Sequence, residues 1–351
     1  MTNIIKLPGL IDIHVHLRDP GQTYKEDFYT GTTAALAGGI TTVFDMPNNL
    51  QPIFTYERLI EKMAIAQKKA VCDYGFYFGT DGKNIAEFEK VKDLVVGLKI
   101  YLNLTTGNIL IEDEQLLDAV FKSWPKDKII VVHAEGEKVD LAIHLTEKYG
   151  NRLHITHLHN RNTLDKVLLA KKRRLSVTYD VTPHHLFLTN KDGAEGLHEI
   201  RPRLQPREDV DYLWSHLKDI DCICTDHAPH TIEEKKSSKP PPGFPGLETM
   251  LPLLLTAVKN GRLTIDDIIR LTNANPQKLF GFRQDEKSYV EIDLNEKYTI
   301  NNESLKTKCG WSPFVGWPVY GRVKNVFIRS KKVFENGKVL TNPGFGRNVI
   351  D

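Results

Sequence analysis

Residues 129–179 read IIVVHAEGEKVDLAIHLTEKYGNRLHITHLHNRNTLDKVLLAKKRRLSVTY, and this stretch decides the fold class. It holds three short apolar, β-branched runs, at 129–132, 153–156 and 175–179. Two charged segments with helical spacing, 138–149 and 163–172, separate these runs. Strands that alternate with helices in this way form parallel sheets whose faces are covered by the helices.

The same alternation extends toward both ends of the chain. Further strand candidates are 10–15, 41–44, 72–78, 97–101 and 221–225, and further helical segments are 27–37, 56–69, 112–122 and 209–217. Eight strands that alternate with helices over about 250 residues predict a (β/α)8 TIM-type barrel, an α/β fold. A doubly wound open sheet is the alternative, but it usually has fewer strands and a glycine-rich turn after the first one.

The C-terminal part of the chain has a different pattern of predicted secondary structure. Short β runs follow residue 283, and Asn336-Gly337 between two of them is a strong signal for a two-residue hairpin. We therefore expect a barrel over residues 8–282 and a small β appendage over 283–351, together with 1–7.

The stretch 237–246, SSKPPPGFPG, cannot form a regular element because consecutive prolines remove donors and fix φ. It is either a surface linker or an ordered loop at a site.

Composition excludes several classes of protein. The 351 residues include 47 Lys and Arg against 45 Asp and Glu, a balance that favours neither nucleic acid nor an anionic membrane as the main partner. No apolar run approaches the roughly 20 residues of a membrane span, and the N-terminus lacks the apolar core of a signal peptide. The four cysteines form no disulfide framework, so we expect a cytoplasmic protein.

Metal-competent side chains recur where the expected strands end. His14 and His16 share one face of the first strand because side chains alternate along a strand. His133, His157 and Asp226 follow the fifth, sixth and eighth strands. Catalytic groups of such barrels gather at the carboxyl ends of the strands. Imidazole and carboxylate without thiolate favour zinc, with iron, manganese, cobalt and nickel as alternatives.

Lys99 lies inside the strand candidate GLKIYL. The plain interpretation is a surface lysine whose stem packs against the strand. If CO2 adds to its neutral amine, however, the carbamate formed is an anion that can bridge two metal ions, and burial lowers a lysine pKa in the required direction. Such a bridge fits a binuclear site in which a shared hydroxide is the nucleophile.

A set of short motifs resembles that of the dihydroorotases, cyclic amidohydrolases of the amidohydrolase superfamily. The resemblance covers essentially the whole chain. Its motifs are DIHVHLRDPG at 12–21, MPN at 46–48, GLK at 97–99, HAE at 133–135, TPHHL at 182–186 and TDHAPH at 225–230. The stretch PPPGFPGLET at 240–249 is especially similar to the dihydroorotase part of the animal multifunctional pyrimidine enzyme.

The resemblance implies a reaction and a metal centre. The reaction is the reversible cyclisation of N-carbamoyl-L-aspartate to L-dihydroorotate in pyrimidine biosynthesis. The ligands of two divalent metal ions, most simply Zn2+, would be His14, His16, His133, His157, Asp226 and carboxylated Lys99. A metal-bridging hydroxide would be the nucleophile, and Asp226 would be the general acid and base.

The resemblance also implies substrate contacts. Arg18, Asn48 and His230 would bind the substrate carboxylate, and the backbone of Pro242 and Gly243 would contact the ring. Arg201 would be a further substrate contact. Residues 103–107 correspond to a mobile loop in which Thr105 would touch substrate, and an ordinary βα loop is the equal alternative. Thr156 and Asp180 replace the Cys and Glu of animal relatives, which leaves a further metal site open.

Two alternatives to a dihydroorotase remain. A hydantoinase, dihydropyrimidinase or allantoinase would use the same metals on substrates without a ring carboxylate, so Arg18, Asn48 and His230 discriminate between them. A catalytically inactive relative that assembles with aspartate transcarbamoylase would be expected to have lost metal ligands, and all six candidates are present. The family also implies a homodimer and a possible association of an active enzyme with that transcarbamoylase.

Overall fold

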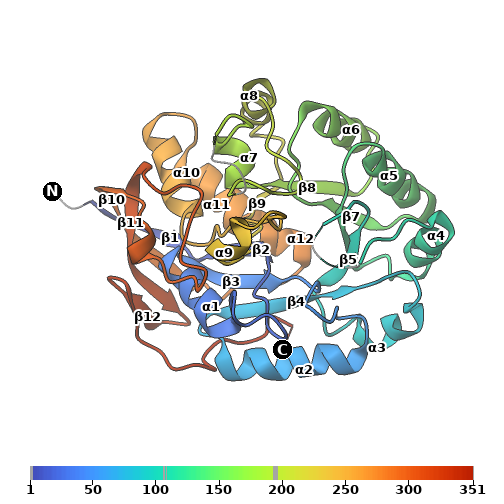
Figure 1. Cartoon of the computed structure of the whole chain (residues 1–351), viewed down its shortest axis with the longest axis horizontal. Coiled ribbons are helices and arrows are strands. Elements are labelled where there is room, and N and C mark those ends of the chain that lie inside the picture. The colour runs from blue at the N-terminus through green and yellow to red at the C-terminus, as the bar shows by residue number, and fades with distance from the viewer. Residues whose placement is uncertain (1–2, 106, 108, 193–196, 351) are drawn as a thin grey trace.

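The computed structural model describes residues 3–105, 107, 109–192 and 197–350 (Figure 1). Its larger sheet has eight strands that are hydrogen-bonded in chain order and run parallel. These strands are β2 (Leu10–Val15), β3 (Ile40–Asp45), β4 (Asp73–Gly79), β5 (Gly97–Tyr101), β6 (Ile129–His133), β7 (Arg152–Ile155), β8 (Val177–Val181) and β9 (Cys222–Ile223). All six side chains of β2 are buried, as expected of a strand with helices outside and a filled barrel inside.

The first strand meets the chain that follows the last one. Val15 of β2 forms a parallel bridge with His227, and the backbone N–H of His16 donates to the carbonyl of His227 over 2.7 Å. The sheet therefore curves round until its ends are in contact, which confirms the predicted (β/α)8 barrel. This contact also brings residues 14–16 beside residues 226–227.

Helices surround the sheet (Figure 1). Those between successive strands are α1 (Phe28–Ala37), α2 (Tyr56–Lys69), the short η1 (Ile85–Glu87) and α3 (Phe88–Val91), α4 (Glu114–Ser123), α5 (Glu137–Tyr149), α6 (Arg161–Lys172), α7 (Pro183–Phe187) and α8 (Arg207–Ser215). After β9 come α9 (Ile232–Lys235), α10 (Met250–Lys259), α11 (Ile265–Ile269), the π-helical η2 (Arg270–Ala274) and α12 (Asn275–Phe280). Helix α1 begins where the Asp27 side chain accepts the N–H groups of Tyr29 and Thr30.

A second, antiparallel sheet of five strands lies beside the barrel. Its order is β1 (Ile4–Pro8), β10 (Tyr289–Thr299), β11 (Pro318–Ile328), β12 (Lys331–Glu335) and β13 (Lys338–Val339). Asn336 and Gly337 connect the last two strands with φ values of 44° and 86°. Positive φ at both central positions is what a tight hairpin turn requires, so the predicted hairpin is confirmed.

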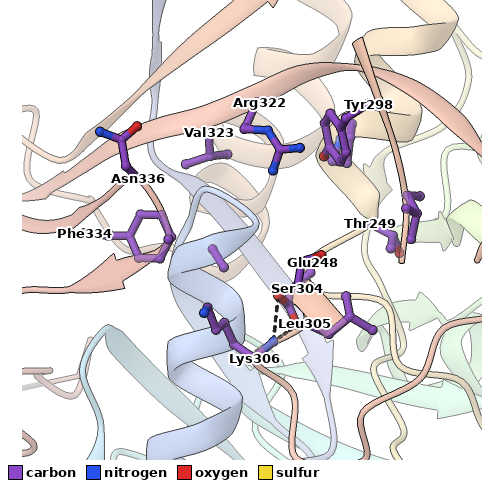
Figure 2. A pocket seen from close by; sticks show the side chains of 14 residues that line it. Glu248, Thr249, Tyr298, Ser304, Leu305, Lys306, Arg322, Val323, Phe334 and Asn336 are labelled. Carbon is purple, nitrogen blue, oxygen red and sulfur yellow. Dashed lines mark hydrogen bonds between the residues drawn. The ribbon is translucent and has the colours of Figure 1, made fainter. Parts of the chain in front are cut away.

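A cavity of about 310 Å3 lies where this sheet meets the barrel (Figure 2). Glu248 lines it, and its carboxylate accepts the backbone N–H groups of Lys306 and Thr307. The segment between β10 and β11, which includes the short helix η3 (Asn302–Ser304), therefore lies against the barrel. Further along this segment, the indole N–H of Trp311 donates to the carbonyl of His230 over 2.8 Å.

The structure departs from the sequence prediction in several elements, including the short helices η1, α3, α7 and α9, which were not predicted. The eighth strand is only two residues long, because its chain leaves the ladder before Asp226. The helices between residues 250 and 280 were not predicted, because α10 is apolar over most of its length and has no clear polar face. In the described part of the chain, no helix is long and apolar enough to cross a bilayer.

Candidate metal centre

The six predicted metal ligands come from five strands and lie at or near the same end of the barrel. His14 is in β2 with His16 one residue beyond that strand, Lys99 is in β5, and His133 ends β6. His157 follows β7 and Asp226 follows β9. Each of these side chains is buried, including Lys99, which has no exposed surface. A fully buried lysine is unusual and excludes the surface-lysine interpretation.

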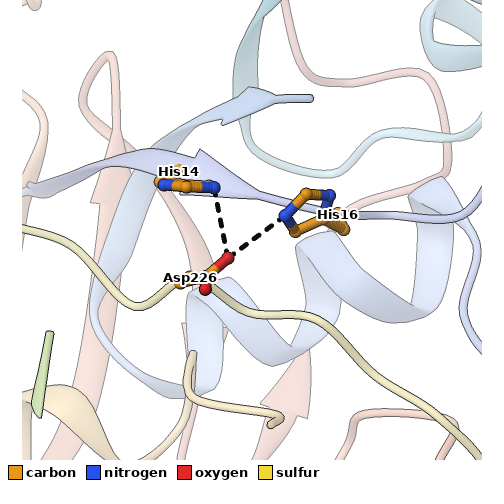
Figure 3. A group of neighbouring side chains, drawn as sticks. All are labelled: His14, His16 and Asp226. Atoms are coloured by element: carbon orange, nitrogen blue, oxygen red, sulfur yellow. Dashed lines mark hydrogen bonds and ion pairs between the residues drawn. The ribbon is translucent and has the colours of Figure 1, made fainter. Parts of the chain in front are cut away.

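Three of these residues form a tight group (Figure 3). Oδ1 of Asp226 lies 3.1 Å from Nε2 of His14 and 3.1 Å from Nε2 of His16. One ligand atom from each residue lies within 4.8 Å of the others, which suits a shared cation. Two imidazole nitrogens that converge on one carboxylate oxygen are a donor set that fits a divalent transition metal ion.

The other ligands lie beside this group. Nδ1 of His133 is 2.9 Å from Nε2 of His157, and the rings of His14 and His157 have centroids 5.5 Å apart. The ammonium of Lys99 donates to the hydroxyl of Thr156 over 3.2 Å, and that hydroxyl is 3.1 Å from Nε2 of His157. Lys99, His133 and His157 therefore lie together at one side of the barrel mouth.

The electrostatics of the cluster fit bound cations. Burial, reinforced by Lys99, lowers the pKa of His14, and burial likewise lowers the pKa of His133 and His157. These imidazoles are therefore neutral at pH 7, the form that binds metal. Burial raises the pKa of Asp226 to about 7, against the opposing charge of Lys99, and lowers the pKa of Lys99 to about 8. Among the described residues, Nε2 of His133 and Nδ1 of His157 have no hydrogen-bond partner.

Three residues of the predicted site have a backbone conformation that L-residues rarely adopt. The φ angles are 62° at Arg18, 41° at His157 and 46° at Asp226. Such a conformation costs on the order of 1–3 kcal/mol and persists only where the surroundings impose it. All three residues lie two or three positions after the last residue of a barrel strand.

Two buried aspartates hold the ligand-bearing segments: Asp12, which was not selected from the sequence, and Asp180, which was named there only as the replacement for a Glu of animal relatives. Asp12 accepts the backbone N–H groups of His14 and Thr225, which joins the first and eighth strands. Asp180 accepts the backbone N–H of His157 over 2.6 Å and lies 2.8 Å from Nε2 of His154. The available signal was an acidic residue within an otherwise apolar strand. Because both Asp180 oxygens are engaged, a further metal ion there would have to displace these contacts.

The predicted substrate residues Arg18, Asn48 and His230 adjoin the metal cluster. Nε of Arg18 donates to the carbonyl of Pro229, and its Nη2 is 3.2 Å from Nε2 of His230. Oδ1 of Asn48 accepts from Nδ1 of His16 over 2.6 Å, so Asn48 also orients a metal ligand. This second contact of Asn48 was not predicted from the sequence.

The proline-rich stretch is an ordered loop beside His230. The carbonyl of Pro242 is 3.1 Å from Nε2 of His230. Gly243 has a φ of 145°, and a Cβ there would lie 2.5 Å from the carbonyl oxygen of Ala228, so only glycine fits. The ammonium of Lys235, which the sequence analysis did not select, donates to the carbonyls of Glu199, Pro241 and Gly243.

Arg201 and Thr105 lie to one side of these residues. Arg201 pairs with Glu199 and lines an open basin of about 760 Å3 together with Glu135 and His159. Thr105 is partly buried in the segment after β5, and residues 106 and 108 lie outside the described residues. Contacts of Arg201 and Thr105 with substrate stay predictions.

The fold and the chemistry of this cluster are those of the metal-dependent barrel hydrolases, and comparison with known proteins specifies the family. The model of the amidohydrolase family matches residues 5–291. A dihydroorotase of Pyrococcus horikoshii is 36% identical over 97% of this chain and 83% of its own length. The chain therefore belongs to the amidohydrolase family and, within it, to the dihydroorotases.

Two further proteins bear on the assignment. The multifunctional protein CAD of Squalus acanthias is 44% identical over 99% of this chain, which spans only 16% of that protein. Among solved structures, an L-hydantoinase (dihydropyrimidinase) from Arthrobacter aurescens has a TM-score of 0.93 and 26% identity, over 98% of this chain and 88% of that one.

Proposed function

We propose that the chain is a dihydroorotase that reversibly converts N-carbamoyl-L-aspartate into L-dihydroorotate in pyrimidine biosynthesis. The observation that carries the proposal is the position of Arg18, whose guanidinium lies beside His230 and interacts electrostatically with Asp226 and His16. A cation there suits a substrate that retains a free carboxylate while its amide is at the metal centre. The Pyrococcus relative named a dihydroorotase supports this substrate.

The cluster would hold two divalent metal ions, for which zinc suits the imidazole and carboxylate ligands. When bound, such ions polarise the scissile carbonyl and lower the pKa of a water molecule. His14, His16 and Asp226 would hold one ion, and His133 and His157 the other. Lys99 would reach both ions as a carbamate.

The carbamate of Lys99 would form without a further catalyst. Since the pKa of Lys99 is about 8, part of the population has a neutral amine near pH 7. The lone pair of that Nζ attacks CO2, a nitrogen–carbon bond forms and one proton leaves to solvent. The product is a buried anion where a buried cation stood before. The histidines beside it are neutral and carry no charge that balances it.

Asp226 would move the proton of the reaction. Its Oδ1 lies 3.1 Å from Nε2 of both His14 and His16, so the carboxylate would adjoin the attacking water and could accept its proton. In hydrolysis it takes a proton from the attacking water and delivers it to the leaving ring nitrogen. In ring closure the same carboxyl group acts in the opposite order.

The remaining predicted residues would hold the substrate. Arg18, Asn48 and His230 would bind its carboxylate, and the backbone of Pro242 and Gly243 would face the ring. Arg201 and Thr105 would make further contacts with the substrate.

A hydantoinase or dihydropyrimidinase activity is the second candidate, and the likeness to the Arthrobacter L-hydantoinase favours it. Those substrates have no ring carboxylate, so they offer Arg18 no partner. An inactive relative is a third possibility, but all six candidate metal ligands are present and gathered in this chain.

The test measures turnover of L-dihydroorotate from the change in its ultraviolet absorbance, with hydantoin and dihydrouracil as competing substrates. We expect dihydroorotate to be the preferred substrate. Arg18→Met should raise KM for dihydroorotate by about a hundredfold, since a charge-assisted contact is lost. Arg161→Met, which changes an exposed arginine paired with Asp165, is the matched control. Preference for hydantoin or dihydrouracil, or an unchanged KM in Arg18→Met, would contradict the proposal.

The organisation of the protein is a further part of the proposal. We place a barrel domain at residues 8–282 and a β appendage at 283–351 with 1–7. We also propose a homodimer and an association with aspartate transcarbamoylase. The likeness to CAD supports the association, and size-exclusion chromatography with and without the transcarbamoylase tests both. All four cysteines are unpaired thiols, which supports a cytoplasmic location.

A further inference from the structure

The imidazole of His230 lies between two cations. The ammonium of Lys25 is 3.1 Å from Nδ1, and Nη2 of Arg18 is 3.2 Å from Nε2. Both cations can only donate hydrogen bonds, whereas a neutral imidazole has one N–H and one lone pair. The ring can therefore accept from Lys25 or from Arg18, but not from both. Which of them it accepts from is determined by its tautomer.

The ring is neutral in this setting. Burial, followed by the charges of Arg18 and Lys25, lowers the pKa of His230 far below that of a free histidine. Lys25 is buried and lies 3.0 Å from Oε1 of Glu234, which favours the charged ammonium. The backbone carbonyl of His230 accepts from the indole of Trp311, so the residue is held from its other side.

The acceptors around the ring distinguish the two tautomers. The carbonyl of Pro242, 3.1 Å from Nε2, can accept a proton from that atom. On the other side, Oε2 of Glu234 is 3.5 Å from Nδ1, beyond the usual hydrogen-bond length, and it already accepts the backbone N–H of Thr231. Both ring nitrogens are satisfied only when Nδ1 accepts from Lys25 and Nε2–H donates to Pro242.

We propose that Lys25 is a positioning residue that holds His230 in the Nε2–H tautomer and thereby keeps Arg18 available for the substrate carboxylate. This inference rests on the proposed function. With a proton on Nε2, Nη2 of Arg18 has no lone pair to donate to. Nε of Arg18 is used by Pro229, and Nη1 has no partner among the described residues. The terminal nitrogens of the guanidinium are therefore left for an anion, while Nε2–H of His230 is held by the carbonyl of Pro242.

The first test measures the tautomer in the full-length protein with its metals bound. Histidine labelled with 15N gives separate NMR signals for protonated and unprotonated ring nitrogens, and His230→Gln assigns the signals of His230. We expect an unprotonated Nδ1 and a protonated Nε2. A proton on Nδ1 of His230 in the unaltered protein would overturn the inference, whatever the variants do.

The second test uses Lys25→Met and Lys25→Arg, with Lys148→Met as control because Lys148 is exposed and paired with Asp118. Lys25→Met should give both His230 tautomers and raise KM for dihydroorotate about tenfold, with kcat changed less than threefold, since one charge-assisted contact is misdirected. Lys25→Arg should recover the single tautomer and part of the KM. An unchanged tautomer and KM in Lys25→Met would overturn the inference. Absence of turnover in the unaltered protein would instead contradict the proposed function, and the tautomer would still be measurable.

Discussion

Asn48 holds His16 through a hydrogen bond of 2.6 Å between Oδ1 of Asn48 and Nδ1 of His16. Because an amide oxygen only accepts, Nδ1 of His16 carries the proton and Nε2 presents its lone pair toward Asp226, 3.1 Å away. The tautomer that binds metal is thus fixed before any metal arrives. Partners of this kind orient metal ligands in many sites.

Asn48→Ala should therefore weaken metal binding as well as substrate binding. We expect a loss of metal affinity of about tenfold or more, because His16 is then free to rotate and to change tautomer. Competition with a chelator, read by metal analysis of the protein, measures it. Asn342→Ala is the control, since Asn342 is exposed in the C-terminal segment. Equal metal affinity in both variants would show that the His16 contact does not matter.

The metal ligands could be predicted from sequence, whereas several of their supports could not. His14, His133 and His157 end short apolar runs, and the parallel barrel brings such ends together whatever the details of the loops. The contact of Lys25 with His230 joins residues 205 positions apart, both in loops. Loop conformation depends on tertiary packing, so no periodicity in the chain could reveal that pair.

Lys99→Met should abolish a carbamate signal and reduce the metal content. The protein equilibrated with 13C-labelled bicarbonate should give a carbamate 13C resonance, because the pKa of Lys99 near 8 leaves part of the amine neutral. The variant should lack the resonance and bind less metal per chain. Lys171→Met, which changes a lysine paired with Asp221 on the outer side of the barrel, should retain both. A full metal complement in Lys99→Met would exclude the bridging role.

Glu248 should make the protein less stable as the pH rises. Burial raises the pKa of its carboxyl group from 4.5 to about 7. The folded chain therefore binds this proton more tightly than the unfolded chain, and the group's contribution to stability declines as the pH rises from about 4.5 to 7. The loss above pH 7 is on the order of 3 kcal/mol at most, at 1.36 kcal/mol for each pKa unit.

Glu248→Gln tests this expectation because glutamine keeps an oxygen for the N–H groups of Lys306 and Thr307 but takes no charge. Unfolding in urea at pH 8 should show a gain in stability over the unaltered protein, and at pH 5 the gain should disappear. Glu61→Gln, at an exposed position of α2, should show no such pH-dependent difference. A constant difference between pH 5 and pH 8 would refute the assignment.

Lys62 should be among the most costly residues to replace outside the metal centre. Its ammonium is fully buried, lies 2.6 Å from Oδ2 of Asp45 and donates to the carbonyl of Met46 and to Oδ1 of Asn49. Asp45 in turn accepts the backbone N–H of Leu17, between His16 and Arg18. Lys62→Met leaves the Asp45 carboxylate buried without its partner and should lower the free energy of unfolding by about 3–5 kcal/mol.

The double variant Lys62→Met with Asp45→Asn separates this electrostatic cost from lost packing. Asparagine can still accept the N–H of Leu17 but carries no charge, so the double variant should be more stable than Lys62→Met alone. Unfolding in urea measures both variants, and metal analysis of each shows whether the segment carrying Asn48 has moved. If the second substitution made the protein still less stable, the uncompensated charge would not be the reason that Lys62 is needed.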